Sequence, residues 1–235
     1  MNILITGASK GIGFELVQKF ASDKTNNVIA LARDLDQLKS LQTLCEKQFN
    51  NVIHIYSIDF LSSTLEDQLS ILMSELDCHF DVVVNNAGHL INKAFAEMKQ
   101  KEIFDIYQIN VFAPMLLIKS LIPFLDKDKA SHVLNIGSMG GFQGSVKFPG
   151  LSIYSSSKSA LGNLTECLAE EYKAENVFFN CLALGSVQTE MLNTAFPGFE
   201  AQVSAKEMAS YVYGFAIQRP LYVNGKVIPV SNTTP

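Results

Sequence analysis

The chain of 235 residues has few cysteines, and their spacing favours neither a metal site nor a redox pair. None of the four forms a Cys-x-x-Cys motif, and none lies near a histidine at metal-ligand spacing. They are Cys45, Cys78, Cys167 and Cys181. We therefore predict free thiols, as is usual in a reducing cytosol, and no metal site.

Clusters of positive charge are also missing. The 18 lysines and arginines are outnumbered by 23 acidic residues, which gives a formal net charge of −5. Nucleic acid and anionic membranes are therefore not expected as partners. Met1 leads directly into the short apolar run NILIT, without the basic segment of a secretory signal, and we expect no stretch long enough to span a bilayer. These features predict a cytoplasmic protein.

Linkers, internal repeats and low-complexity tracts are absent too. Hydrophobic residues make up 48% of the chain and charged residues 17%, which is typical of a globular protein. A chain of this length commonly forms one domain. We therefore treat residues 1–235 as a single domain.

Short apolar runs alternate with longer helical patterns along the whole chain. The runs are continuous rather than alternating, which indicates strands buried on both faces of a parallel sheet. We expect strands at 2–6, 27–32, 52–57, 81–85, 132–137, 177–183 and 226–230, and helices near 12–22, 35–48, 64–76, 96–126, 153–174 and 204–214. The pattern predicts an α/β fold, a doubly wound parallel sheet of about seven strands with helices on both faces.

The segment ITGASKGIGFEL lies where the first strand should meet the first helix. Its spacing, G-x-x-x-G-x-G, allows a tight turn and the close approach of a pyrophosphate to the backbone. The N–H groups at the start of the helix also favour a phosphate. A P-loop is excluded because Gly11-Ile12-Gly13 replaces its Gly-Lys-Ser/Thr. The predicted dinucleotide-binding residues here are Thr6, Gly7, Ser9, Lys10, Gly11, Ile12 and Gly13.

The end of the second strand bears on the choice of cofactor. A carboxylate there would bind the ribose 2′-OH of NAD, whereas a nearby arginine accommodates the 2′-phosphate of NADP. This strand ends in Ala32 followed by Arg33, and Lys10 lies in the glycine loop. The two cations favour NADP(H), with NAD(H) as the alternative. Asp34 leaves that alternative open, because it is placed to pair with Arg33 or to replace the missing carboxylate.

With this loop and five downstream motifs, the chain resembles the short-chain dehydrogenase/reductase family, whose members are NAD(P)-dependent oxidoreductases with a Rossmann fold. The resemblance covers most of the chain. It implies that the adenine is held by Asp59 and Phe60, and it matches the family's Asn-Asn-Ala-Gly motif at 85–88. It identifies Asn110, Ser138, Tyr154 and Lys158 as catalytic, and it adds Asn86, Ala87, Gly88, Tyr154, Lys158, Gly185, Val187 and Thr189 to the cofactor site.

The spacing of Tyr154 and Lys158 suits the chemistry that the resemblance implies. A free tyrosine has a pKa of about 10, and an ammonium one helical turn away is expected to lower it. Tyr154 would then exchange a proton with the oxygen of a carbonyl or alcohol substrate, while Ser138 orients that oxygen. In the family, Asn110 would hold a water that links Lys158 to solvent.

Three features depart from the family pattern. Leu184 replaces the usual proline before Gly185, which leaves the geometry of that loop open. Ser138 and Tyr154 lie 16 positions apart, somewhat more than is common in the family. The C-terminal NGKVIPVSNTTP lacks the usual Asp-Gly-Gly, which leaves the last strand and any tetramer contact open.

The substrate site is expected to be formed by 139–151 and 189–204, with His89 as a further candidate. The apolar Met191, Leu192, Phe196 and Phe199 indicate either a nonpolar substrate or packing of a lid. Substrate classes left open are 3-oxoacyl thioesters and small ketones, aldehydes or sugar-like carbonyls. For an acyl carrier protein, Lys93, Lys99 and Lys101 are the only candidates for a basic patch.

Two further questions stay open. The alternative to an enzyme is a dinucleotide-binding regulatory or structural protein without turnover. The segment 110–125 is apolar almost all round, so that it requires cover from the sheet and a neighbouring helix or from a second subunit. The resemblance implies a homodimer or homotetramer.

Overall fold

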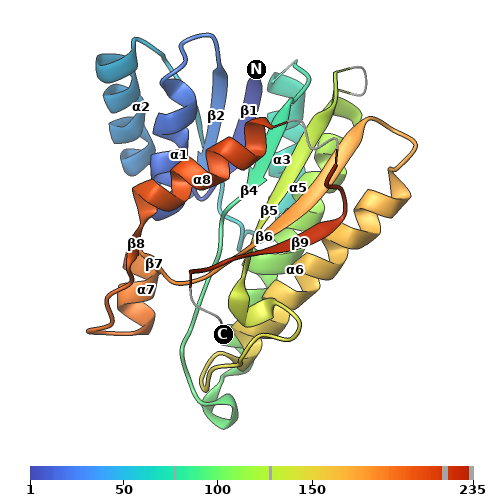
Figure 1. The fold of residues 1–235 in the computed structure, drawn as a ribbon. Coiled ribbons are helices and arrows are strands. Elements are labelled where there is room, and N and C mark those ends of the chain that lie inside the picture. The colour runs from blue at the N-terminus through green and yellow to red at the C-terminus, as the bar shows by residue number, and fades with distance from the viewer. Residues whose placement is uncertain (77, 127–128, 219–221, 233–235) are drawn as a thin grey trace.

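The computed structural model describes residues 1–76, 78–126, 129–218 and 222–232. Seven strands in it form one parallel sheet in the order β3-β2-β1-β4-β5-β6-β9 (Figure 1). They are β1 (Asn2–Thr6), β2 (Asn27–Ala32), β3 (His54–Ser57), β4 (Val82–Asn85), β5 (Ser131–Ser138), β6 (Val177–Leu184) and β9 (Lys226–Val230). The predicted α/β fold with a seven-stranded parallel sheet is confirmed.

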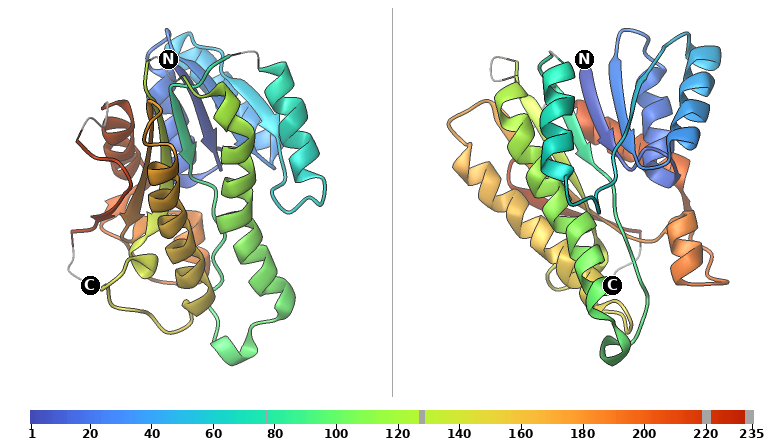
Figure 2. Two further views of the ribbon diagram at one scale, coloured as in Figure 1. Left: turned by 90° about the vertical axis from the view of Figure 1, so that its right-hand side faces the viewer. Right: turned by 180° about the vertical axis from the view of Figure 1, so that it is seen from behind.

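Helices cover both faces of this sheet (Figures 1 and 2). One face carries α1 (Gly11–Ala21), α2 (Leu35–Phe49) and α8 (Ala205–Ile217). The other carries α3 (Leu65–Glu75), α5 (Ala113–Leu121) and α6 (Ser152–Glu171). In β1, Ile3 and Ile5 enter the first core and Leu4 the second, which is why the strands read as continuous apolar runs.

The strand order places the functional site. It reverses between β1 and β4, and in open α/β sheets ligands bind beyond the carboxyl ends of the strands at such a point. The glycine loop follows β1, and the Asn-Asn-Ala-Gly motif begins at the end of β4. A short sheet of β7 (Val187–Gln188) and β8 (Val203–Ser204) lies with α7 (Glu190–Ala195) beyond the same strand ends (Figure 1).

Helical structure is found over most of the range expected at 96–126, but the type of helix changes along it. A 3₁₀ turn (Phe95–Glu97) precedes α4 (Gln100–Tyr107), a π-helical turn (Gln108–Phe112) separates α4 from α5, and a second 3₁₀ turn (Ile122–Phe124) ends the run. Pro114 stands at the start of α5, and Pro123 lies in the last turn. The π-helical turn contains Asn110, and such turns are frequent at functional sites.

The expectation that no stretch is long enough to span a bilayer is not met for the segment Gln100–Phe124. Its 25 residues would suffice, by length and composition, to cross a membrane. In this fold it packs on the second core, where Leu117, Ile118 and Leu121 are buried against α3 and the sheet. Part of the apolar surface of this segment is thus buried within the fold.

The last strand forms without the family's usual C-terminal sequence. Asn224 accepts a 2.9 Å hydrogen bond at Oδ1 from the N–H of Phe179, and Gly225 donates one of 2.8 Å to the Phe179 carbonyl. This pairing starts the register of β9 on β6. The four cysteines, all in the described part of the chain, form no disulfide, and Cys45 and Cys181 are buried.

Candidate active site

The glycine loop between β1 and α1 folds tightly against the residues after β4. Gly7 has a φ of 67°, and a Cβ atom on it would lie 2.8 Å from the Cα of Ala87. A Cβ atom on Gly13 would lie 2.3 Å from the carbonyl oxygen of Gly7 and 2.5 Å from Nδ2 of Asn86. Both positions therefore require glycine. The result is a backbone cradle at the N-terminus of α1, which suits a pyrophosphate.

Thr6 and Asn86 fasten this cradle to β4. Thr6 Oγ1 accepts hydrogen bonds of 3.0 Å from the N–H groups of both Asn86 and Ala87. Asn86 Nδ2 donates to the carbonyl oxygens of Thr6 at 2.9 Å and Gly7 at 3.3 Å. The side chain of Asn85 joins β4 to β5 by donating to Oδ1 of Asn135. These bonds agree with positioning roles for the two asparagines.

The start of α1 supports the interpretation as a phosphate site. Lys10 is the N-cap residue, and its side chain makes no capping hydrogen bond. The N–H groups of Gly11, Ile12 and Gly13 therefore begin a helix without a side-chain partner. Ser9 lies half-buried in the same loop. The predicted loop residues are thus brought together around one helix terminus.

Charged side chains gather at the end of β2, beside the glycine loop. Lys10 forms an ion pair of 2.7 Å with Glu190, the first residue of α7. Asp34 caps α2 by accepting a hydrogen bond from the N–H of Gln37 at 3.1 Å. Arg33 is exposed. The carboxylate of Asp34 therefore caps α2, and the acidic partner of Lys10 is Glu190, which lies far away in the sequence.

The predicted adenine residues lie after β3. Asp59 is exposed and accepts the N–H of Leu61 at 3.0 Å, which fixes the turn. Phe60 is 8% exposed and belongs to the second core. Its carbonyl oxygen accepts a hydrogen bond of 3.1 Å from Nε2 of Gln108, in the π-helical turn. This bond ties the adenine loop to the segment that carries Asn110.

Ser138, Tyr154 and Lys158 come together beyond the end of β5. The Tyr154 hydroxyl forms a hydrogen bond with the side chain of Ser138, and Ser138 Oγ also accepts the N–H of Gly140 at 3.2 Å. Lys158 follows one turn later on α6, with Nζ 6.0 Å from the centre of the Tyr154 ring. Nζ donates a hydrogen bond of 2.8 Å to the carbonyl oxygen of Ile136. A carbonyl oxygen beside Ser138 and Tyr154 would meet two hydroxyl groups.

The electrostatics differ from the expectation. Burial raises the pKa of Tyr154, and the hydrogen bond from Ser138 opposes that change. Burial also lowers the pKa of Lys158 to about 8. The expectation that Lys158 depresses the pKa of Tyr154 is therefore not met, because removal of the tyrosine from water dominates the change and only the hydrogen bond with Ser138 opposes it. Tyr154 is held as a neutral hydroxyl, the form that donates a proton.

Asn110 is fully buried, and protein groups occupy both ends of its amide. Oδ1 accepts the N–H of His89 at 2.7 Å, while Nδ2 donates to the His89 carbonyl at 2.9 Å and to Ser157 Oγ at 3.0 Å. A Cβ atom on Gly88 would lie 3.5 Å from Lys158 Nζ and 3.6 Å from Asn110 Oδ1. The missing side chain of Gly88 thus leaves space between the ammonium and the amide oxygen.

The segment after β6 closes the site from the other side. Leu184 extends β6 by one residue and pairs with Val230, which a proline at this position would hinder. Gly185 donates its N–H to the Val230 carbonyl at 2.8 Å. Val187 is buried in β7, and Thr189 caps α7 through its hydroxyl. A Cβ atom on Gly11 would lie 3.3 Å from Thr189 Cγ2, so that this segment contacts the glycine loop.

A family comparison identifies this arrangement. A model of the family described as short chain dehydrogenase matches residues 1–198. The chain belongs to that family. It is an oxidoreductase that acts on CH–OH or C=O groups and uses a nicotinamide dinucleotide.

Individual relatives and solved structures agree. The chain is 29% identical over 221 residues to a fatty acyl-CoA reductase of Acinetobacter baylyi, which covers 92% of this chain and 73% of the relative. A putative short-chain dehydrogenase of Shigella flexneri, solved with NADP, superposes with a TM-score of 0.89 at 26% identity, over 97% of this chain and 95% of that one. The RhlG/NADP complex of Pseudomonas aeruginosa superposes with a TM-score of 0.84 at 26% identity, over 98% of this chain and 94% of that one.

Sequence reasoning missed several residues around the short-chain dehydrogenase site. Asn92 donates from Nδ2 to the carbonyl oxygen of Ala195, and Lys93 donates its N–H to that of Gly150. The segment after β4 therefore joins both predicted substrate walls. Ser157, between Tyr154 and Lys158, holds Asn110 by accepting the hydrogen bond from its Nδ2. Only its place in a Tyr-x-x-x-Lys motif signals that role.

Proposed function

We propose that this enzyme is an NADP(H)-dependent carbonyl reductase or alcohol dehydrogenase that uses Tyr154 as the proton donor and acceptor. The observation that carries the proposal is the hydrogen bond between Tyr154 and Ser138, with the Lys158 ammonium 6.0 Å from the tyrosine ring. These groups lie at the same sheet edge as the glycine cradle. A protein that only bound a dinucleotide would have no use for a neutral tyrosine hydroxyl aimed at a serine.

Each residue of the site contributes a separate part of the reaction. Ser138 and Tyr154 would bind the substrate oxygen through two hydroxyl groups and orient it. In reduction, Tyr154 donates its proton to that oxygen, and Lys158 stabilises the phenolate that is left. When bound, the nicotinamide supplies or accepts the hydride. Asn110 fixes the backbone of His89 beside the space at Gly88, through which a water-borne proton would reach Lys158.

The preference for NADP(H) rests on the end of β2. Ala32 provides no carboxylate for a ribose 2′-OH, and the carboxylate of Asp34 accepts a hydrogen bond from the N–H of Gln37. The cations Arg33 and Lys10 lie near one another, since the charge of Arg33 acts to lower the pKa of Lys10. The solved relatives that carry NADP or NADPH support the same cofactor.

An apolar substrate fits the lid between α7 and β8. Met191 is 40% exposed and Phe199 is 49% exposed, so that neither is fully used in packing the lid. The methyl carbon of Met191 would lie 3.8 Å from a Cβ atom on Gly88, next to Lys158 and Asn110. A carbonyl with an apolar substituent is therefore the substrate that we propose. The relative named as a fatty acyl-CoA reductase supports this class.

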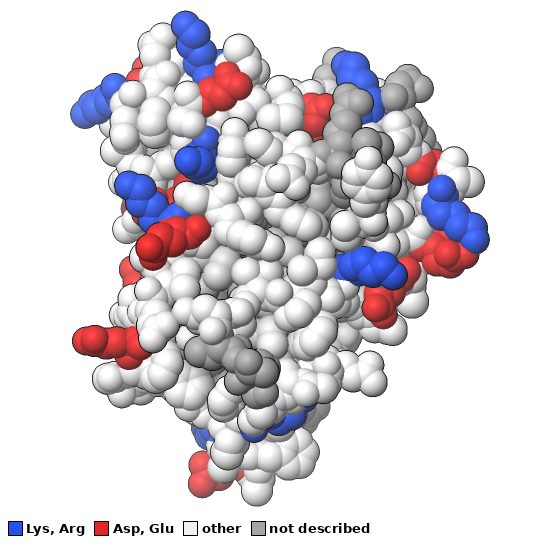
Figure 3. Space-filling view, in the orientation of Figure 1, with Lys and Arg blue, Asp and Glu red and all other residues white. Residues whose placement is uncertain are grey.

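A large acidic partner has less support. Lys93 is paired with Glu102 at 3.0 Å and Lys101 with Asp105 at 2.6 Å, which neutralises two of the three lysines considered for an acyl carrier protein. On the face shown in Figure 3, lysines and arginines are scattered, most of them beside acidic side chains. We therefore propose a small free or thioester-linked carbonyl compound, in a cytoplasmic enzyme.

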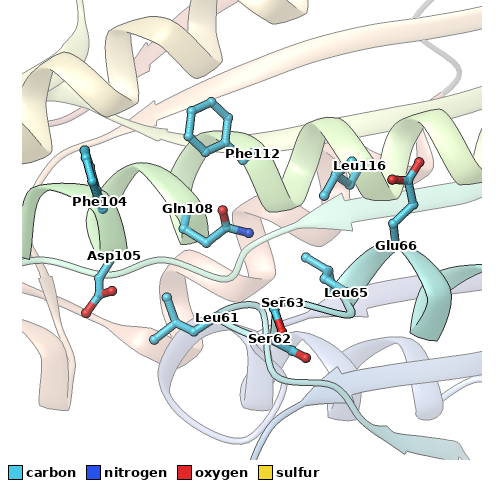
Figure 4. Close-up of a pocket in the computed structure, with 10 residues that line it drawn as sticks. All are labelled: Leu61, Ser62, Ser63, Leu65, Glu66, Phe104, Asp105, Gln108, Phe112 and Leu116. Atoms are coloured by element: carbon cyan, nitrogen blue, oxygen red, sulfur yellow. The ribbon is translucent and has the colours of Figure 1, made fainter. Parts of the chain in front are cut away.

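The face of α4 and α5 supports a homodimer. Phe104 is 60% exposed, Phe112 47% and Met115 37%. Phe104 and Phe112 border a groove of about 590 Å³ between this helix run and the segment after β3, lined by Leu61, Ser62, Ser63, Leu65, Glu66, Phe104, Asp105, Gln108, Phe112 and Leu116 (Figure 4). Light scattering should give a dimer mass that Phe112→Asp reduces to that of a monomer, whereas Val52→Asp, at an exposed position before β3 that does not line the groove, leaves it unchanged. A monomeric wild type would contradict the proposal.

Oxidation of NADPH with a panel of aliphatic and aromatic carbonyls tests the activity. Tyr154→Phe should lower kcat by about 10²–10⁴ and leave NADPH affinity within about twofold, because it removes only the proton donor. Tyr107→Phe is the matched control, since it removes a hydroxyl that donates to Ser156 Oγ at 3.0 Å on the same helix pair. NADPH binding with no turnover on any carbonyl, unaffected by Tyr154→Phe, would favour the alternative, a binding protein without turnover.

A further inference from the structure

An ion pair joins the glycine loop to the lid across 180 positions of sequence. Lys10 Nζ and Glu190 Oε2 are 2.7 Å apart, and the two side chains are 53% and 69% exposed. Beside them, Thr189 lies against Gly11. The first residue of α7 thus reaches the residue that caps α1.

The surroundings of Lys10 single out Glu190 as its partner. The pKa of Lys10 is raised, first by the hydrogen bond and charge of Glu190 and to a smaller extent by Asp34, while Arg33 opposes the change. Asp34 already accepts the N–H of Gln37 at the start of α2. Two cations and two carboxylates therefore share the corner where β2 ends, and only Glu190 forms an ion pair with Lys10 in the described chain.

We propose that Glu190 sets the discrimination between NADPH and NADH by competing with the 2′-phosphate for Lys10. The inference rests on the proposed function, because it requires a dinucleotide in the glycine cradle. A 2′-phosphate must displace the Glu190 carboxylate from the Lys10 ammonium, and it also meets the repulsion of that carboxylate. NADH lacks the phosphate and meets neither cost. Glu190 therefore weakens NADPH binding selectively, so that the wild-type preference is smaller than Lys10 and Arg33 together would give.

Dissociation constants for NADPH and NADH, measured by titration calorimetry on the full chain, test the inference without any turnover. Glu190→Gln should tighten NADPH binding about three- to tenfold and leave NADH binding within about twofold. Glu200→Gln is the control, because it removes the same charge from the segment after α7, where the structure records no ion pair for Glu200. Glu190→Gln made in a Lys10→Met background should tighten NADPH binding less than in the wild type, because only the repulsion between the carboxylate and the 2′-phosphate is then removed, and it should leave NADH binding unchanged.

Three results would overturn the inference. Equal changes for both dinucleotides, or weaker NADPH binding, would mean that the ion pair holds the lid closed over any cofactor. An effect of Glu200→Gln on NADPH binding as large as that of Glu190→Gln would mean that the change in affinity comes from the net charge of the protein and not from the ion pair. A wild-type chain that binds neither dinucleotide would remove the proposed function and this inference together, whereas normal binding with an unchanged ratio would remove only the inference.

Discussion

Lys158 Nζ donates a hydrogen bond of 2.8 Å to the carbonyl oxygen of Ile136, in a position where the lysine is 5% exposed. The bond directs the ammonium to the space between the end of β5 and Tyr154. Because burial disfavours the charge, the pKa of Lys158 falls to about 8. The residue that we propose to stabilise the phenolate is thus charged at neutral pH and loses its charge only slightly above it.

This pKa predicts the pH dependence of reduction. The value of kcat/KM for NADPH, which reports the free enzyme, should be level near pH 7 and fall about tenfold per pH unit above about pH 8. Lys158→Arg keeps its charge over this range, so that its remaining activity should not show the decline. A wild-type profile that stays flat to about pH 10 would contradict the assigned role of Lys158.

The glycine cradle yields a prediction about stability and binding. A Cβ atom on Gly13 would lie 2.3 Å from the Gly7 carbonyl oxygen, a backbone atom that cannot move aside cheaply. Gly13→Ala should therefore lower the free energy of unfolding by about 2–4 kcal/mol and abolish dinucleotide binding. Urea denaturation and calorimetry measure the two effects.

A second glycine provides the control. Gly214 lies in α8 with no atom within 4 Å of the position of its Cβ. Gly214→Ala should raise the free energy of unfolding by about 0.5–1 kcal/mol, because alanine loses less backbone entropy in a helix. Equal effects of the two substitutions would show that the cradle is not tightly packed.

Ser157 gives a prediction for a residue that lies between Tyr154 and Lys158 but contacts neither reacting group. Its Oγ accepts from Asn110 Nδ2 at 3.0 Å and donates to the Tyr154 carbonyl at 2.7 Å. Ser157→Ala should destabilise the fold by about 1–2 kcal/mol, since it takes a partner from a buried amide, and it should lower kcat more than it changes KM. Ser156→Ala on the exposed side of α6 is the matched control. An unchanged kcat in Ser157→Ala would limit Ser157 to a structural role.

The sequence predicts the sheet well because its five inner strands are buried on both faces, while the edge strands β3 and β9 are only partly buried. Continuous apolar runs fixed six strand starts within about one residue, while the expected start at Val52 was early because Val52 is 58% exposed and lies before β3. The small sheet of β7 and β8 escaped prediction because two-residue strands have no hydrophobic period. Likewise, no local pattern signals the π-helical turn that carries Asn110, whose partners His89 and Ser157 are distant in the sequence.

In the candidate site, too, local spacing was predictable from the sequence, whereas burial and long-range contacts were not. Motif spacing places Tyr154 and Lys158 one turn apart, and the structure has them so. Spacing says nothing about burial, which is why the direction of the Tyr154 pKa was wrong. The sequence also could not predict the partner of Lys10, because Glu190 is distant in the sequence and approaches Lys10 only in the folded chain.

His132 is a buried histidine outside the site. Its Nδ1 is 3.2 Å from the carbonyl oxygen of Ala216, and its Nε2 is 3.2 Å from Nδ2 of Asn180. Both of these contacts are buried. The ring packs against Phe215. Burial lowers the pKa of His132 to about 4 from an ordinary value of 6.5.

Acid should therefore destabilise the fold through His132. Its folded-state pKa is depressed, so its unfolded form binds the extra proton, and the stability present above pH 6.5 is lost as the pH falls towards 4. At about 1.4 kcal/mol per pH unit, urea denaturation should show a loss of about 2 kcal/mol between pH 7 and pH 5. His89, whose pKa burial also lowers, adds to this loss. His132→Leu should remove about 2 kcal/mol of the pH dependence whatever its stability at pH 7, and His54→Leu on the exposed start of β3 should not. Equal slopes in wild type and His132→Leu would show that His132 is not buried as a neutral ring.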